Sequence, residues 1–207
     1  MMSRAPQFDQ AQILDAAERL IARHGPSGAT VGAIAQAVGA PTGSIYHRFD
    51  SRDVLLAEVW LGAATAFQTA FFERLTGPAP REAGLAAALY MAQRVRERPR
   101  EARVLLLHRR EDFVDRGWPA NMRRRAEQLG RQVETELRAF SRRLCGRQDA
   151  RTVRSIAYAL VEAPVAAVRR HVAAEESPPA YVDGLIRTTY EAVIRHLGVS
   201  RTKRSIT

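Results

Sequence analysis

Hydrophobic residues recur along this chain at intervals of three and four, the spacing that places side chains on one face of an α-helix. The first such run extends over residues 9–24, and a shorter one follows over 31–38. A third element, poor in apolar residues, extends over 41–47. A fourth run begins at a cap provided by Asp50 or Ser51 and continues to about Leu75.

Residues that stop or cap helices separate these runs. Gly25 and Pro26 end the first run, and the hydroxyl of Thr30 is placed to cap the second. Gly39 ends the second run, because glycine adopts the positive φ of a tight turn without steric cost.

The remaining chain continues the helical pattern beyond a breaker cluster at residues 76–80. Pro164 lies inside one of the expected helices and predicts a kink or an early end there. Further amphipathic stretches are expected at 81–97, 100–116, 119–145, 149–174 and 179–197. Together with a composition rich in Ala, Leu, Arg and Glu, these stretches predict an all-α fold.

Residues 31–45 fit a helix-turn-helix, in which two short helices cross at close range. Counting Val31 as the first position, the fifth is Ala35, a small residue suited to the crossing point. The ninth is Gly39, in the turn, and the fifteenth is Ile45, which anchors the second helix to the first. A helical pair without any DNA-binding role can match the same three positions.

The surrounding residues resemble the TetR family of bacterial regulators over residues 9–60. The matching segments are Ile13-Leu14-Asp15-Ala16-Ala17, Gly25, Thr30, Ile34-Ala35, Val38-Gly39, Gly43-Ser44-Ile45-Tyr46 and Phe49-Asp50-Ser51-Arg52-Asp53-Val54-Leu55. The resemblance implies an N-terminal three-helix helix-turn-helix DNA-binding domain over 9–53. A larger α-helical ligand-binding and dimerisation domain is expected over 54–197, followed by a flexible tail over 198–207.

The resemblance also implies roles at matching positions. Thr30, Tyr46 and Arg52 are expected to contact phosphates, which sets the register of the protein on DNA. Base edges in the major groove are expected to meet the first half of the third helix. The candidate DNA-binding residues are Thr30, Pro41, Thr42, Gly43, Ser44, Tyr46, His47, Arg48 and Arg52.

The sequence departs from the family pattern at three places. Pro26 stands where an aromatic residue is usual, and His47-Arg48 stands where an aromatic residue and a histidine are common. Asp50 places a carboxylate near the expected phosphate contact.

Several of these residues also have plain structural alternatives. Tyr46 can pack on the first helix, His47 and Arg52 can be solvated, and Thr42 and Ser44 can cap the third helix.

The last two helices carry wider apolar faces than one domain needs. Pairing them with their two-fold copies makes a four-helix interface, as the resemblance implies, so a homodimer is expected. The alternative is an intramolecular core. The candidate interface residues are Ile156, Leu160, Ala163, Leu185, Ile186, Thr189 and Val193.

Aromatic and polar residues on the central helices are candidates for a small-molecule effector site, with ordinary core packing as the alternative. They are Tyr90, His108, Phe113, Trp118, Met122 and Tyr158. Many arginines lie between residues 94 and 154, which raises the hypothesis of an anionic effector, such as a carboxylate or acyl-thioester. Surface solvation and pairing with nearby acids is the competing explanation.

The net charge of +10 is unevenly distributed. Residues 1–75 carry a net −1, residues 76–155 a net +9 and residues 156–207 a net +2. The basic excess therefore lies outside the expected DNA-binding segment, which predicts a shallow dependence of DNA affinity on salt.

The single cysteine, Cys145, and the absence of a run of about 18 apolar residues favour a cytoplasmic protein without a membrane span. The first ten residues lack the apolar core of a secretory signal. Phosphate-binding loops, nucleophile elbows and paired-histidine motifs are missing, so neither an enzyme nor a metal or cofactor site is expected.

These observations favour a repressor released from a palindromic double-stranded DNA operator by a small hydrophobic effector. An activator, a ligand-independent or architectural DNA-binding dimer, and a protein-interaction dimer with a degenerate helix-turn-helix are the alternatives.

Overall fold

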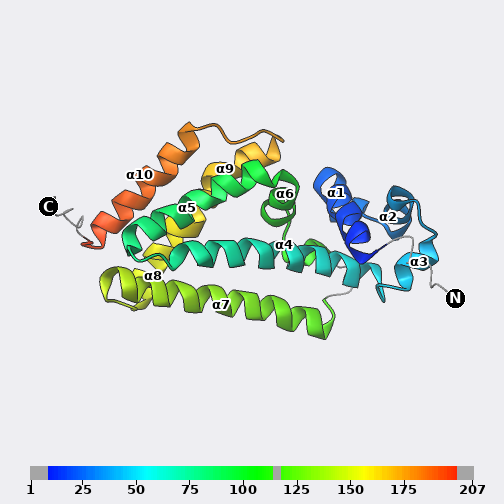
Figure 1. Cartoon of the computed structure of the whole chain (residues 1–207), viewed down its shortest axis with the longest axis horizontal. Helices are drawn as coiled ribbons and strands as arrows, with labels where there is room; N and C mark the ends of the chain where they lie inside the picture. The colour runs from blue at the N-terminus through cyan, green and yellow to red at the C-terminus, as the bar shows by residue number, and fades with distance from the viewer. Residues whose placement is uncertain (1–8, 114–117, 200–207) are drawn as a thin grey trace. The chain divides into compact units, whose positions relative to one another are not determined.

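The computed structural model describes residues 9–113 and 118–199, and all regular elements within them are helical (Figure 1). The predicted all-α class is therefore confirmed. The N-terminal half contains α1 (Gln10–Gly28), α2 (Val31–Val38), α3 (Thr42–Tyr46), α4 (Arg52–Leu75), α5 (Pro80–Glu97) and α6 (Pro99–Leu107). The 3₁₀ turn η1 (Arg110–Phe113), α7 (Ala120–Cys145), α8 (Ala150–Ala157), the π-helical turn η2 (Tyr158–Glu162), α9 (Ala163–Ala173) and α10 (Tyr181–His196) follow.

The first helix is capped as its sequence suggests but does not end at residue 24. The Asp9 carboxylate accepts from the Gln12 N–H at 2.7 Å, and the Gln12 side chain accepts from the Asp9 N–H at 3.1 Å, forming a capping box. Gly25, with φ 74° and ψ 171°, interrupts the helix, and a further turn then runs to Gly28. The interruption was predicted correctly, whereas the additional turn was not.

The helix expected over 100–116 is too long. α6 ends at Leu107, and His108 is extended with φ −118° and ψ 144°. The Asp112 carboxylate then accepts from the Arg109 N–H at 2.7 Å, which stabilises η1. Residues 114–117, the end of the expected helix, lie outside the described residues, as does most of the expected tail at 198–207.

Pro164 disturbs its helix in the predicted region. Proline has no N–H to donate to the carbonyl four residues earlier, so regular α-helical bonding fails there. The N–H of Ala163 donates to the Tyr158 carbonyl five residues back, which closes the π turn η2 immediately before the proline. The helical path then continues as α9 rather than ending.

The chain divides into two compact units. The first comprises residues up to Phe67 together with 98–129, and the second comprises 68–97 and 130 onward. Helices α4 and α7 each contribute residues to both units. The unit with the expected helix-turn-helix therefore also contains α6 and the start of α7.

The core of the first unit forms where α1 packs against α2 and α6. Its fully buried members include Ile13 and Ile21 of α1, Ile34 of α2, and Ile45 of α3. Burial of apolar area contributes about 25 cal/mol per Å² to folding, so these side chains stabilise the unit.

In the second unit α5 packs against α9 and α10 (Figure 1). Tyr190 of α10 is fully buried and donates its hydroxyl to the Arg81 carbonyl at 2.8 Å. Burial raises the pKa of that phenol. At the other end of α5, Arg96 pairs with Asp183 at 3.1 Å.

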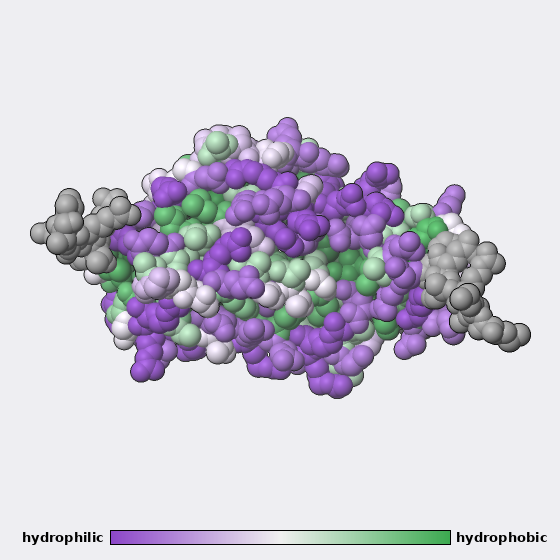
Figure 2. All heavy atoms as spheres, in the orientation of Figure 1, coloured by the Kyte–Doolittle hydropathy of each residue, from purple (hydrophilic) through white to green (hydrophobic). Residues whose placement is uncertain are grey.

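Helix α4 is apolar along most of its length, and by length and composition alone it could cross a membrane. Within its most apolar window 44% of the helix is buried, and core helices of soluble proteins meet the same criterion, so this is weak evidence of a span. Hydrophilic residues cover most of the face in Figure 2, with hydrophobic ones exposed between them.

Gly84 provides a test of the α5–α10 packing. A Cβ atom there would lie 2.3 Å from Tyr190 Oη and 2.7 Å from Phe140 Cζ. We expect Gly84→Ala to lower the free energy of unfolding by about 1–3 kcal/mol through overpacking. Gly130→Ala in α7, where a Cβ atom meets nothing within 4 Å, is the control and should stabilise by about 0.5–1 kcal/mol. Denaturant unfolding at one protein concentration measures both, and equal effects would contradict this packing.

Candidate DNA-binding site

The turn between α2 and α3 is fixed by local chemistry. Thr30 is the N-cap of α2, and its hydroxyl accepts from the Ala33 N–H at 3.1 Å. Gly39 ends α2 in the left-handed conformation, with φ 70° and ψ 28°. The N–H of Ala40 then donates to the Ala35 carbonyl at 2.9 Å, which completes the helix end.

Ile45 anchors α3 to the core. Its side chain is 1% exposed, in one cluster with Ile34, Ala35 and Phe49, so the predicted crossing of the two helices is present. The opposite side of α3 is open to solvent. The exposed candidates there are Pro41, Thr42, Gly43, Tyr46 and His47.

Three candidate side chains are placed in ways that bear on the alternatives. Tyr46 is 53% exposed, so it does not pack into the core. Thr42 and Ser44 do not cap α3, because its N-cap is Pro41, which makes no side-chain cap hydrogen bond. Ser44 is half-buried, and its carbonyl accepts from Arg48 Nη1 at 3.1 Å.

Of the two residues expected to cap α4, Asp50 and Ser51, it is Ser51 that does so. Ser51 accepts from the Val54 N–H at 3.1 Å through its hydroxyl, whereas Asp50 is exposed. The Arg52 guanidinium points back to α1 and donates to the carbonyls of Pro26 and Ala29. Sequence reasoning missed this contact, because its partners lie 23 and 26 residues away.

The N–H of Thr30, expected to face a phosphate, donates to the Gly28 carbonyl at 3.0 Å. The phosphate roles of Thr30 and Arg52 therefore stay predictions, and both groups have intramolecular partners in this structure.

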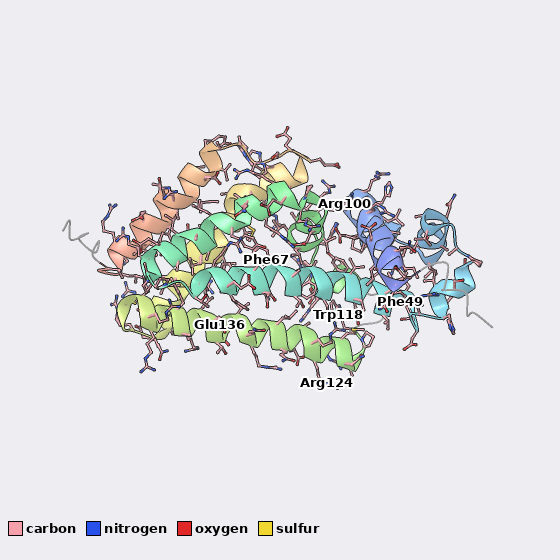
Figure 3. The ribbon with its side chains drawn as sticks, viewed as in Figure 1. Phe49, Phe67, Arg100, Trp118, Arg124 and Glu136 are labelled. Carbon is pink, nitrogen blue, oxygen red and sulfur yellow. The ribbon has the colours of Figure 1, made fainter. Side chains whose placement is uncertain are left out.

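Ionisable residues line the contact between α1 and α6. Burial raises the pKa of Glu18, and the nearby carboxylates of Glu101 and Asp15 raise it further, while Arg100 lowers it. Arg100 lies on α6 (Figure 3). Its Nη1 is 3.5 Å from the Asp15 carboxylate of α1. Arg103 of α6 donates to the Ala22 carbonyl at 2.5 Å. Arginines of α6 thus bind both the side chains and the backbone of α1.

The interrupted end of α1 lies close to His108. A Cβ atom at Gly25 would lie 3.5 Å from His108 Cε1, and the imidazole stacks edge-on with Phe113 at 6.2 Å between ring centroids. Burial lowers the pKa of His108, which favours the neutral imidazole.

The candidate effector residues fall into separate groups. Besides His108 and Phe113, the first unit holds Trp118 and Met122, which cluster with Leu61. Trp118 also lies edge-on to Trp60, with 5.5 Å between the ring centroids.

Tyr90 belongs to the second unit, is 2% exposed, and has the Arg74 guanidinium 3.8 Å from its ring centroid. Tyr158, also in the second unit, is 46% exposed. An effector site formed from these residues stays a prediction.

A surface pocket of about 560 Å³ opens in the second unit between the α8–η2 segment and α10. Its lining includes one effector candidate, Tyr158, and one interface candidate, Val193. The complete lining is Arg154, Ser155, Tyr158, Glu162, Ala192, Val193 and His196. Arg154 is among the arginines that raised the hypothesis of an anionic effector. The other four residues were not predicted, since their helical spacing gives no signal of a pocket.

The candidate interface residues divide by burial. Ile156, Leu160 and Ile186 are at most 1% exposed and belong to the protomer's own core. Leu185 is 54% exposed, and the remaining candidates Ala163, Thr189 and Val193 are half-buried.

Among residues 9–113 and 118–199, no group of three or more His, Cys, Asp or Glu side chains is arranged to hold a metal ion.

A similar sequence segment and a similar fold occur in known proteins. Residues 13–59 match the family model described as bacterial regulatory proteins, tetR family. No curated protein matches the chain. The matched segment begins in α1, includes the whole of α2 and α3, and ends in α4.

Solved structures share the fold over nearly the whole chain. The fatty acid degradation regulator FadR from Bacillus halodurans has a TM-score of 0.69 at 17% identity, covering 93% of this chain and 96% of that chain. The regulator FadR from Bacillus subtilis in complex with stearoyl-CoA also has a TM-score of 0.69, at 16% identity, with 90% and 98% covered. The TetR family regulator PfmR from Thermus thermophilus has a TM-score of 0.68 at 20% identity, with 91% and 99% covered.

The match over residues 13–59 and the exposed face of α3 indicate a helix-turn-helix of the kind found in bacterial transcription regulators. Over this segment the chain is similar to the tetR family of bacterial regulatory proteins, as the residues from Ile13 to Leu55 had indicated.

Proposed function

We propose that this protein is a cytoplasmic repressor that binds a palindromic operator as a homodimer and is released by a small-molecule effector. The observation that carries the proposal is the exposed face of α3, held on the core by Ile45. A recognition helix needs one side anchored on its domain and the other side free for the major groove. α3 has this arrangement.

Base readout is assigned to Thr42, Ser44 and the Gly43 backbone at the start of α3. Thr42 and Gly43 are exposed, and none of the three is needed as a side-chain cap. Tyr46 and His47, on the exposed side at the end of α3, are assigned to phosphates.

A randomised duplex library tests the proposal without knowledge of the regulated genes. We expect selection to enrich a palindrome whose half-site centres lie about 10–10.5 base pairs, or a multiple of this, apart. Enrichment of no common sequence would contradict sequence-specific regulation.

The Tyr46 hydroxyl provides the matched test on the selected duplex. Tyr46→Phe removes one hydrogen bond to a charged phosphate per half-site, so we expect affinity to fall by at least about tenfold. The thermal stability of the free protein should not change, because the side chain is 53% exposed. Fluorescence anisotropy and thermal unfolding measure the two effects, and unchanged affinity would remove Tyr46 from the site.

Dimerisation is assigned to the outer face of α8, η2 and α10. The large hydrophobic residues exposed on these elements are Leu185, Tyr181 and Tyr158, at 54%, 51% and 46%. Val193 and Ala192 lie farther along α10 and line the pocket beside Tyr158. A second copy related by two-fold symmetry would bury these groups and place two recognition helices on one face of DNA.

Leu185→Arg is expected to give a folded monomer, because dimerisation would bury an unpaired charge. Gln132→Arg, which adds the same charge to the exposed surface of α7, should remain dimeric. Sedimentation velocity at micromolar concentration separates the two outcomes. A dimer of the Leu185 variant, or a monomer of the unchanged protein, would contradict this interface.

The effector is assigned to a hydrophobic small molecule, with an anionic acyl compound as the alternative. One solved structure with this fold is a complex with stearoyl-CoA, which supports the alternative by likeness of fold only. A thermal-shift panel of neutral hydrophobes and fatty acyl-thioesters discriminates the two classes, because a ligand stabilises the state it binds. An activator is the second candidate function, because the position of the operator relative to the promoter decides between repression and activation.

A further inference from the structure

The Arg52 guanidinium links the start of α4 to the end of α1, where it binds the carbonyls of Pro26 and Ala29. We call this pair of contacts the clasp. The Nε of Arg52 donates to the Ala29 carbonyl at 3.1 Å, and its Nη2 donates to the Pro26 carbonyl at 2.5 Å. Its Nη1 lies 3.7 Å from a carboxylate oxygen of Asp53. The side chain is half-buried, so these contacts are partly shielded from water.

Both carbonyls that Arg52 binds lie at the C-terminal end of α1, where the Pro26 carbonyl also accepts from the Ala29 N–H at 3.2 Å. The last carbonyls of a helix lack intrahelical donors and form the negative end of its dipole. The last turn of α1 contains no basic residue of its own, and the helix is interrupted at Gly25. A guanidinium presents several donors in a rigid plane, which allows one side chain to satisfy two carbonyls.

The clasp lies next to the DNA-binding helices in the chain. Ala29 directly precedes Thr30, the N-cap of α2, and the Thr30 N–H donates to the Gly28 carbonyl at 3.0 Å. Whatever holds the carbonyl of Ala29 therefore fixes the first turn of α2 relative to α4. Because α2 carries α3 through the Gly39 turn, the position of the exposed α3 face depends on the same contact.

We propose that Arg52 is a positioning residue that sets α2 and α3 for DNA, and that it is not a phosphate ligand. This inference rests on the proposed DNA-binding function. In this structure Nε and Nη2 are engaged with backbone carbonyls, so a phosphate would have to compete with them.

Arg52→Lys separates the two roles. Lysine keeps the positive charge and suits a phosphate as a point charge, but it has no planar fork to hold two carbonyls. The clasp predicts a loss of DNA affinity of about tenfold or more for Arg52→Lys. A direct phosphate contact predicts affinity close to that of the unchanged protein.

The salt dependence of DNA binding distinguishes the two roles of Arg52, because its slope follows the number of phosphate contacts. Loss of one phosphate contact per half-site lowers the slope of log K against log salt by about 0.9, or about 2 for a dimer. The clasp predicts an unchanged slope for Arg52→Ala despite weaker binding. Arg100→Ala removes a charge from the same unit without breaking a backbone contact, and should keep near-normal affinity.

Amide hydrogen exchange on the free protein tests the clasp independently of DNA. Arg52→Lys should speed exchange at residues 28–33 and leave α10 unchanged. Normal affinity of Arg52→Lys, a lower salt slope of Arg52→Ala, or normal exchange at 28–33 would each overturn the proposal. If the unchanged protein binds no duplex, the proposed function fails, while the exchange measurement still decides the clasp.

Discussion

The proposed DNA-binding face depends on the burial of Ile45 in the core cluster that also contains Ile34. α3 has only five residues, too few to be stable as an isolated helix, so its position comes from this anchor, from the turn before it and, as proposed, from the Arg52 contacts that set α2. Gly39 in the left-handed conformation makes that turn, and Ala35 keeps the crossing close. Because Ile45 holds one side of α3 on the core, the opposite side of the helix faces solvent and is free to contact a DNA groove.

Several arginines connect elements within one unit. Several of them bind backbone carbonyls or acids on another element, as Arg103 does with Ala22 and Arg96 with Asp183. Arg125 of α7 similarly pairs with Glu58 of α4 at 2.5 Å. Some arginines in the strongly basic middle of the chain are therefore used in contacts between elements of one unit, while many others are exposed.

Local chemistry made α2 predictable at both ends, because Thr30 and Gly39 act on their immediate neighbours. The exposed α3 face followed from the periodic position of Ile45. The end of α6 was not predictable, since it depends on His108 meeting Phe113 and the distant end of α1. The candidate interface shows the same limit: apolar spacing alone does not distinguish the residues that face the protomer's own core, such as Ile186, from exposed ones.

Amide hydrogen exchange with and without the selected duplex tests most directly whether α3 reads DNA. The account predicts that DNA increases protection chiefly at residues 30–47, at the α2–α3 pair and the turn between them. Protection gained mainly over the arginine-rich start of α7, residues 120–131, with residues 41–47 unchanged, would contradict it.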